Sequence, residues 1–149
     1  MTVLRHLRTE RGRHPAPWAP LRRPLAECRL ALVASSICLA PAGRGFDRGV
    51  QVGDPAFREV AGDVPTTDLL ARSRSGADAS RANLDRNLAF ALDRLREAVA
   101  EKRLGELNRR HLALGGAMAS TGRAIRKRAP QAAQWLAADS VDVALLVPT

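Results

Sequence analysis

His111, Arg58 and Asp47 are the side chains of this 149-residue chain whose types and positions best suit chemistry. An imidazole with a pKa near neutrality can shuttle protons, so His111 is a candidate catalytic acid–base group. A guanidinium can bind a carboxylate through two parallel hydrogen bonds, so Arg58 is a candidate substrate-binding residue. Asp47 lies in a glycine-containing loop after an apolar run, the kind of strand exit where α/β proteins bind ligands.

Each of these residues also has a structural interpretation. His111 lies in a loop-like stretch before two glycines, where a histidine can serve a surface or hinge role. Arg58 can form an ion pair with a neighbouring carboxylate such as Glu59. A loop aspartate such as Asp47 often only hydrogen-bonds the backbone, and Asp54 is expected to cap a short helix.

The two cysteines, Cys28 and Cys38, do not point to redox or metal chemistry. Their spacing fits neither a zinc knuckle nor a redox pair, and two cysteines are too few for a disulfide scaffold. A lone cysteine in an apolar stretch behaves as a small hydrophobic residue. Aspartates and histidines are too scattered for a metal site, so these residues predict neither a metal nor a bound cofactor.

Positive charge is concentrated in the N-terminal segment. The chain carries a net charge of +9, and residues 1–29 hold seven arginines against two glutamates. The rest of the chain is only mildly basic, which argues against a folded nucleic-acid-binding face. The chain has two tryptophans, three phenylalanines and no tyrosine, too few rings for a single-strand stacking platform. A small protein that uses its basic arm to bind nucleic acid or an acidic partner is the alternative function.

Residues 1–26 are expected to form a disordered arm outside the folded domain. Four prolines and seven charged residues leave this segment little to bury. No apolar run in the chain approaches the roughly 20 residues that cross a bilayer, and the N-terminus lacks the apolar core of a secretory signal. A cytoplasmic protein without a membrane partner is the simplest interpretation.

Residues 27–149 alternate between strand-like and helix-like patterns. Short runs rich in valine, leucine and alanine, at 29–41 and 141–148, are typical of buried parallel strands. Residues 84–103 carry apolar side chains at a 3.6-residue period and predict the clearest helix. Further helical segments are expected at 53–60 (a short turn), at 116–128, and from Pro130 onward.

This alternation predicts an α/β domain over residues 27–149, with a partial parallel, Rossmann-like sheet and flanking helices. The strand at 141–148 has no crossover helix after it, so one sheet face would be poorly covered. The sequence therefore predicts marginal stability or association.

The order of several motifs between residues 17 and 149 resembles one family. These motifs are PWAPLRRPLAECRLALVASS, GFD, GDPAFREV, NLAFALDRLREAV, LGEL, RRHLALGGA and DVALLVPT. The family is the selenoprotein B component of the glycine, sarcosine, betaine and D-proline reductases, with relatives that use cysteine. GDPAFREV and LDRLREAV are the most specific parts of the match, and His111 matches the histidine of the family's R-H-x-x-x-G stretch.

The resemblance implies reductive chemistry on amino-acid-like substrates. In the family, a selenol or thiol attacks the substrate and is regenerated by a dithiol partner, so a thioredoxin-like reductant or other reductase subunits are the implied partners. The selenocysteine or cysteine follows the strand that is similar to DVALLVPT and opens the next helix. A helix N-terminus stabilises a thiolate and lowers its pKa, which suits that position.

The chain ends at Thr149, just before the place where the resemblance puts this redox residue. Selenocysteine is encoded by UGA, ordinarily a stop codon, so we expect a UGA after Thr149 and a downstream frame with further βα units. A real truncation at Thr149 is the alternative explanation. A different stop codon would contradict this expectation. The 149 residues on their own are expected to be inactive.

The sequence also departs from the family pattern before NLAFALDRL. The family has a histidine-rich stretch there, followed by Tyr-Asp, whereas this chain has RSRSGAD and retains only Asp78. Ala91 stands where the family has proline. Any acid–base or ligand role of the missing histidines is therefore not available to this chain.

Overall fold

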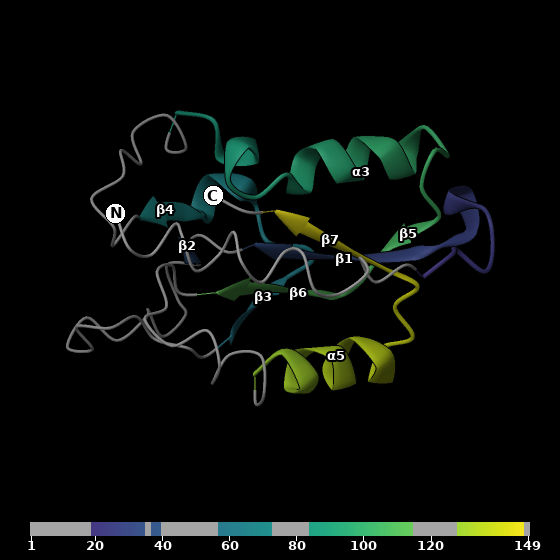
Figure 1. The fold of residues 1–149 in the computed structure, drawn as a ribbon. Coiled ribbons are helices and arrows are strands. Elements are labelled where there is room, and N and C mark those ends of the chain that lie inside the picture. The colour runs from purple at the N-terminus through teal and green to yellow at the C-terminus, as the bar shows by residue number, and fades with distance from the viewer. Residues whose placement is uncertain (1–18, 35–36, 40–56, 73–83, 115–127, 148–149) are drawn as a thin grey trace, which may run out of the picture.

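A computed structural model describes residues 19–34, 37–39, 57–72, 84–114 and 128–147. They form an α/β fold in which one mostly parallel sheet lies between two helices, with α3 (Leu92–Ala100) on one face and α5 (Ala129–Ala138) on the other (Figure 1). The predicted mixed α/β class with a largely parallel sheet is confirmed.

The central strand is β1 (Arg29–Ala34), and all of its residues from Leu30 onward are buried. On one side, β1 pairs in parallel with β7 (Val143–Val147). On its other side, the start of β1 pairs in parallel with β5 (Glu106–Leu107) and its end with β6 (Arg110–Leu114). The outer strand β3 (Phe57–Ala61) pairs antiparallel with β6. A strand covered on both faces needs a continuous apolar run, and the sequence LALVA of β1 supplies it.

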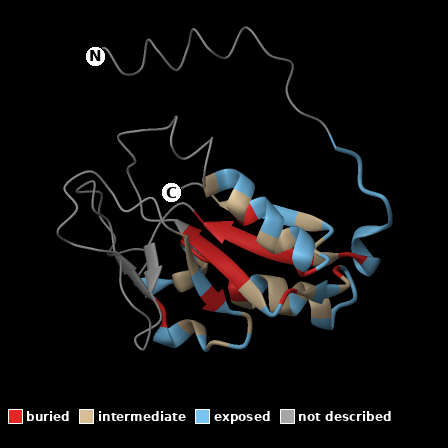
Figure 2. Ribbon diagram, turned by 90° about the horizontal axis from the view of Figure 1, so that it is seen from below, coloured by how far each residue is buried: buried red, intermediate tan, exposed pale blue. Residues whose placement is uncertain are grey.

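Alternating side chains of β1 and β6 divide the core between the two helices. Leu32, Ala34 and Ala113 belong to the cluster that includes Phe90 and Leu92, on the α3 face. Val33 and Leu112 pack instead with Ala132, Trp135 and Leu136 of α5. Figure 2 shows buried residues concentrated along the sheet and exposed residues on the outer sides of the helices.

The predicted helix over 84–103 is wrong in its extent. A 3-10 turn, η3 (Arg86–Leu88), comes first, and α3 begins only at Leu92. The Asp85 carboxylate accepts the N–H of Asn87, and the Asn87 side-chain oxygen accepts the N–H of Asp93. The first bond caps η3, and the second satisfies a backbone N–H in the first turn of α3. The two segments therefore start separately, and the helical period of the sequence is interrupted between them.

The predicted helical turn over 53–60 is also wrong for its described part, because residues from Phe57 form strand β3. Val60 is buried opposite His111, and Phe57 packs against the cluster under α5. Pairing with β6 therefore overrides a local signal that rested on a cap and a proline. Asp54 lies outside the described residues.

Four further expectations have mixed outcomes. The predicted strand at 29–41 is divided into β1 and β2 (Ile37–Leu39), and β2 pairs antiparallel with β4 (Leu70–Arg72) in a second, two-stranded sheet. The short helix from Pro130 is confirmed as α5. The strand at 141–148 is confirmed as β7, but its central residues are exposed, so its expected burial is wrong. The predicted helix over 116–128 falls almost wholly outside the described residues.

The remaining described segments are short 3-10 turns, η1 (Leu25–Glu27) and η2 (Thr66–Asp68). The Cys28 side chain is fully buried, and its thiol donates to the Pro24 carbonyl at 3.3 Å. This contact attaches the end of the expected arm to the domain. This confirms the structural interpretation of Cys28. Residues 1–18 lie outside the described part of the chain.

Candidate functional site

Two of the three predicted site residues lie on one face of the sheet. In the β3–β6 pair, Val60 is opposite His111 and Arg58 is opposite Ala113. Directly opposed residues share a face, and residues two apart along a strand share it too, so Arg58 and His111 are diagonal neighbours on the α3 face. Asp47 lies outside the described residues.

Arg58 lies near the carboxyl end of β6, because Phe57 pairs with Leu114. The parallel strands β1, β6 and β7 all run toward this edge of the sheet, where α/β proteins place their ligands. A guanidinium at this edge is suitably placed to bind a carboxylate. The residues that follow β1, β6 and β7 are outside the described part of the chain.

His111 is part of strand β6, so the expectation of a loop-like stretch is wrong. Its side chain is fully buried, and its ring contacts the Phe90 ring edge-on with 6.0 Å between centroids. The Nδ1 atom accepts the backbone N–H of Leu32 at 3.1 Å, which requires a neutral imidazole with its proton on Nε2. Nε2 has no hydrogen-bond partner among the described residues.

Burial, and then the positive charge of Arg96, lower the pKa of His111 to about 4. The imidazole is therefore neutral at pH 7 and is not in contact with solvent. A role in proton transfer would require a rearrangement that brings Nε2 to a substrate. That catalytic role stays a prediction, while the bond to Leu32 is a structural role that the geometry already provides.

Arg96 and Asp93 on α3 tie this helix to the loop after β3. Arg96 donates to the carbonyls of Gly62 and Val64 at 2.9 and 2.7 Å, and it pairs with Asp93 at 3.0 Å. Burial raises the pKa of Asp93, but hydrogen bonds from Thr66, Asn87 and Arg96 outweigh this effect and lower it. The cluster holds α3 over the face that carries Arg58 and His111.

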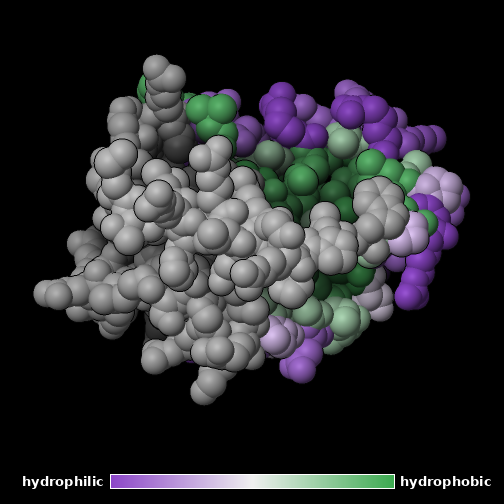
Figure 3. Space-filling view, in the orientation of Figure 1, coloured by the Kyte–Doolittle hydropathy of each residue, from purple (hydrophilic) through white to green (hydrophobic). Residues whose placement is uncertain are grey.

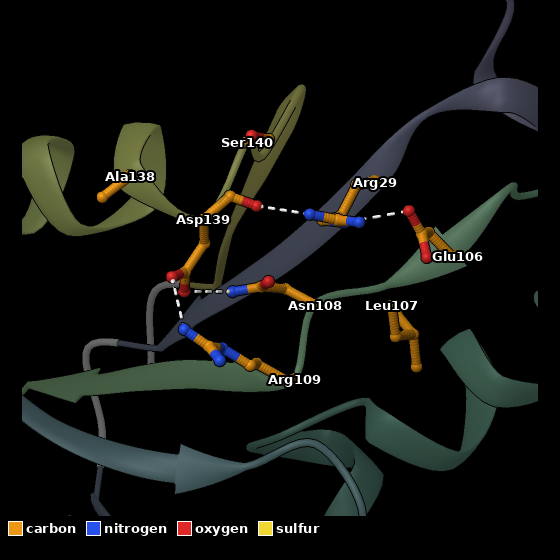
Figure 4. Close-up of a pocket in the computed structure, with 8 residues that line it drawn as sticks. All are labelled: Arg29, Glu106, Leu107, Asn108, Arg109, Ala138, Asp139 and Ser140. Atoms are coloured by element: carbon orange, nitrogen blue, oxygen red, sulfur yellow. Dashed lines mark hydrogen bonds and ion pairs between the residues drawn. The ribbon is translucent and has the colours of Figure 1, made fainter.

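A second polar cluster lies at the opposite, amino end of the parallel strands (Figure 4). It surrounds a cavity of about 430 Å³ lined by Arg29, Glu106, Leu107, Asn108, Arg109, Ala138, Asp139 and Ser140. In Figure 4, the Arg29 guanidinium lies between the backbone carbonyl of Asp139 and the carboxylate of Glu106.

Asp139 is the centre of this cluster, and its side chain is only 3% exposed. Its carboxylate accepts hydrogen bonds from Arg110 at 2.6 and 2.9 Å and from Asn108 at 2.9 Å. These donors lower the pKa of Asp139 to about 2. A buried, paired carboxylate of this kind fixes the end of α5 to the start of β6 and is not available as an acid or base.

Sequence reasoning missed the pairing of Asp139 with Asn108 and Arg110. The only signal was the presence of polar residues beside two predicted elements, at the end of a helix and before RHLAL. Separations of about 30 residues carry no periodic pattern, so the contact is visible only in the folded chain.

Within the described ranges, no group of three or more histidine, cysteine, aspartate or glutamate side chains is arranged to hold a metal ion. None of the helices in those ranges has the length and apolar character that crossing a bilayer requires.

Comparisons with known proteins identify no family for this chain. No protein-family model, curated protein or solved structure matches the chain.

Proposed function

We propose that this chain is related to the selenoprotein B component of the glycine, sarcosine, betaine and D-proline reductases. Its sheet would be the first part of a Rossmann-like domain that acts reductively on amino-acid-like substrates. The observation that carries the proposal is where the resembling motifs fall. LALVA, RHLAL and VALLV lie on β1, β6 and β7, neighbouring parallel strands that run toward one edge.

Arg58 has the clearest proposed role at that edge. An amino-acid-like substrate carries a carboxylate, which a guanidinium binds through two parallel charge-assisted hydrogen bonds. Because Arg58 lies beside the carboxyl end of β6, a substrate held there would present its reacting carbon to groups that follow the parallel strands. Asp47 remains the second proposed binding residue.

The chemistry itself would use a selenol or thiol as nucleophile. A dithiol partner would supply the two electrons of the reduction and become a disulfide. Neither cysteine of the 149 residues stands in a Cys-Pro-x-Cys motif, and Cys28 is buried against the Pro24 carbonyl. We therefore expect no turnover of glycine, sarcosine, betaine or D-proline by this chain with dithiothreitol, and clear dithiol-dependent reduction would contradict the proposal as stated.

Substrate binding provides the positive test. We expect saturation-transfer NMR to detect binding of at least one of these four compounds to the full chain. Arg58→Gln should abolish this signal, because the amide cannot replace the charged, bidentate donor. Arg94→Gln is the matched control, since Arg94 pairs with Glu97 on the exposed side of α3. Binding that survives Arg58→Gln, or no binding of any of the compounds, would contradict the proposed site.

A further inference from the structure

Strand β7 exposes apolar residues on both faces of the sheet. In the described sheet, β7 pairs with β1 alone, with Leu145 opposite Leu32 and Leu146 opposite Val33. The two leucines therefore face opposite sides, and they are 38% and 69% exposed. Figure 3 shows hydrophobic surface between α3 and α5, where this strand lies.

The hydrogen bonds of β1 show which backbone groups of β7 point away from the sheet. The Leu30 carbonyl accepts the N–H of Asn108, so the backbone polar groups of Leu30 point toward β5. Those of the next residue, Ala31, therefore point the other way, toward β7. In a parallel pair, such a residue bonds to the two neighbours of the residue opposite it.

The residue opposite Ala31 is Ala144, so Val143 and Leu145 direct their backbone polar groups toward β1. The alternate residues, Ala144 and Leu146, direct their N–H and C=O groups outward. Among the described residues, none bonds to these four groups. The outer edge of β7 is therefore a short row of unpaired donors and acceptors.

The sequence of β7 does nothing to block this edge. The five residues VALLV contain no charge and no proline, the features that natural edge strands use to prevent further pairing. A helix packed on one face would cover one leucine and leave the backbone groups unpaired. An extended strand along the edge can reach both leucines and all four groups.

We propose that this strand is β7 of a second copy, so that two chains form a dimer with one continuous sheet. The two β7 strands run antiparallel, with Leu145 opposite Leu145 of the second copy. On either side of the two-fold axis, Ala144 then lies opposite Leu146 and exchanges both N–H···O bonds with it. All four outward groups of each strand are satisfied.

The neighbouring two-fold registers are poorer. A pair centred on Ala144 would set Leu146 against Asp142, whose N–H already donates to the Arg29 carbonyl at 2.9 Å. A pair centred on Leu146 would need an N–H from residue 148, which is proline in the sequence. The backbone therefore favours the register centred on Leu145.

The side chains suit the same register. The two Leu145 side chains meet on the α3 face, as a directly opposed pair that is not hydrogen-bonded and so lies close together. On the α5 face, each Leu146 lies opposite the small Ala144, which leaves room for the larger side chain. Val143 meets Val147 at both ends, so every opposed pair is apolar.

The symmetry of the contact favours a second copy over an unlike partner. Both chains use the same surface, so the pairing closes at two copies and leaves no β7 edge open. The inference does not depend on the proposed reductase relationship.

Sedimentation velocity of the full chain measures the association. Five-residue strands form a small interface, so we expect a reversible equilibrium with a dissociation constant on the order of 10 µM. Ala144→Pro removes an outward N–H and none that bonds to β1, and it should weaken the dimer by on the order of tenfold. Ala144→Ser is the matched control, because it keeps this N–H and should dimerise like the unsubstituted chain.

Cysteine cross-linking tests the register. In a Cys38→Ser background, the one native thiol that remains is the buried Cys28. Leu145→Cys should form an intermolecular disulfide on mild oxidation, because its Cα atoms in the two copies lie within the span of a disulfide. Leu146→Cys is the matched control: its position is more exposed, but it faces Ala144 of the second copy and should cross-link more slowly.

Three results would overturn the proposal. A chain that stays monomeric well above the expected dissociation constant would show that its own arm or another segment covers the edge. Equal association of Ala144→Pro and Ala144→Ser would mean that a different surface joins the copies. Faster cross-linking through residue 146 than through residue 145 would rule out the register.

Discussion

The side chain of His111 occupies the place of a backbone acceptor for Leu32. Strand β1 pairs with β5 up to Leu30 and with β6 from Val33, so two residues of β1 face the four residues 108–111. This bulge interrupts the ladder, and Nδ1 of His111 accepts the buried N–H of Leu32 at 3.1 Å. The histidine thus joins the two central strands at a point where the backbone of the partner strand is displaced.

The burial of His111 makes stability depend on pH. The folded chain holds the imidazole with a pKa of about 4, against 6.5 for an unperturbed histidine, so the unfolded chain binds more protons between these values. The unfolding free energy is therefore fully retained above pH 6.5 and decreases as pH falls toward 4, by up to about 3 kcal/mol. Urea denaturation at intervals between pH 4 and 8 measures this change.

His111→Asn is the control for this pH dependence. The Asn side-chain oxygen can take the place of Nδ1 and accept the N–H of Leu32, but it does not titrate. We expect the variant to lose most of the pH dependence between 6.5 and 4. An unchanged dependence would show that another group is responsible.

Arg96 influences the same histidine through its charge. Its guanidinium lowers the pKa of His111, and it also donates to the carbonyls of Gly62 and Val64. Arg96→Gln should raise the pKa of His111, which the NMR shift of the imidazole Hε1 measures as a function of pH. The same substitution should lower the unfolding free energy by about 2 kcal/mol. Arg94→Gln, on the exposed side of the same helix, should change neither quantity, and a similar pKa shift in both variants would contradict this explanation.

Asp139 should be the most sensitive carboxylate of the fold. Asp139→Asn leaves Arg110 without its buried charge partner and should lower the unfolding free energy at pH 7 by about 3 kcal/mol. Because the pKa of Asp139 in the folded chain is about 2, below its ordinary value of 3.8, this contribution is present above pH 3.8 and is lost as pH falls through 2.

Glu106→Gln provides the comparison for Asp139→Asn. Glu106 pairs with Arg29, but its side chain is more than half exposed. Exposed pairs contribute little, so we expect a loss below about 1 kcal/mol in the same urea titration. Equal losses in the two variants would contradict the central role given to Asp139.

Gly105 is required by the close approach of β5 to the start of β1. A Cβ at this position would lie 2.7 Å from the Cys28 carbonyl oxygen and 2.8 Å from the Glu27 carbonyl carbon. Gly105→Ala should therefore destabilise the chain by about 2 kcal/mol, because two backbone segments must separate.

Ser140→Gly should instead stabilise the chain, because Ser140 has a φ of 57° that glycine adopts without strain. Thermal unfolding of the two variants measures both changes.

The sequence by itself determined the apolar segments and their class. Local composition, together with the proline and small polar residues that end each segment, predicts three elements: the run LALVA of β1, the helix from Pro130 and the short run at β7. Their alternation is typical of an α/β sheet. The buried thiol of Cys28 was likewise expected, because it lies beside an apolar run. Local patterns suffice where each residue's environment is set by its immediate neighbours along the chain.

Only the tertiary structure decided the pairings between distant segments. It placed Phe57–Ala61 in a strand, because Val60 opposite His111 is stabilised by partners some 50 residues away. It also put β7 at the edge of the sheet that the described strands form, and it joined Asp139 to Arg110. Such contacts arise from the three-dimensional packing of the core, and neither hydrophobic periodicity nor residue spacing records which segments will meet.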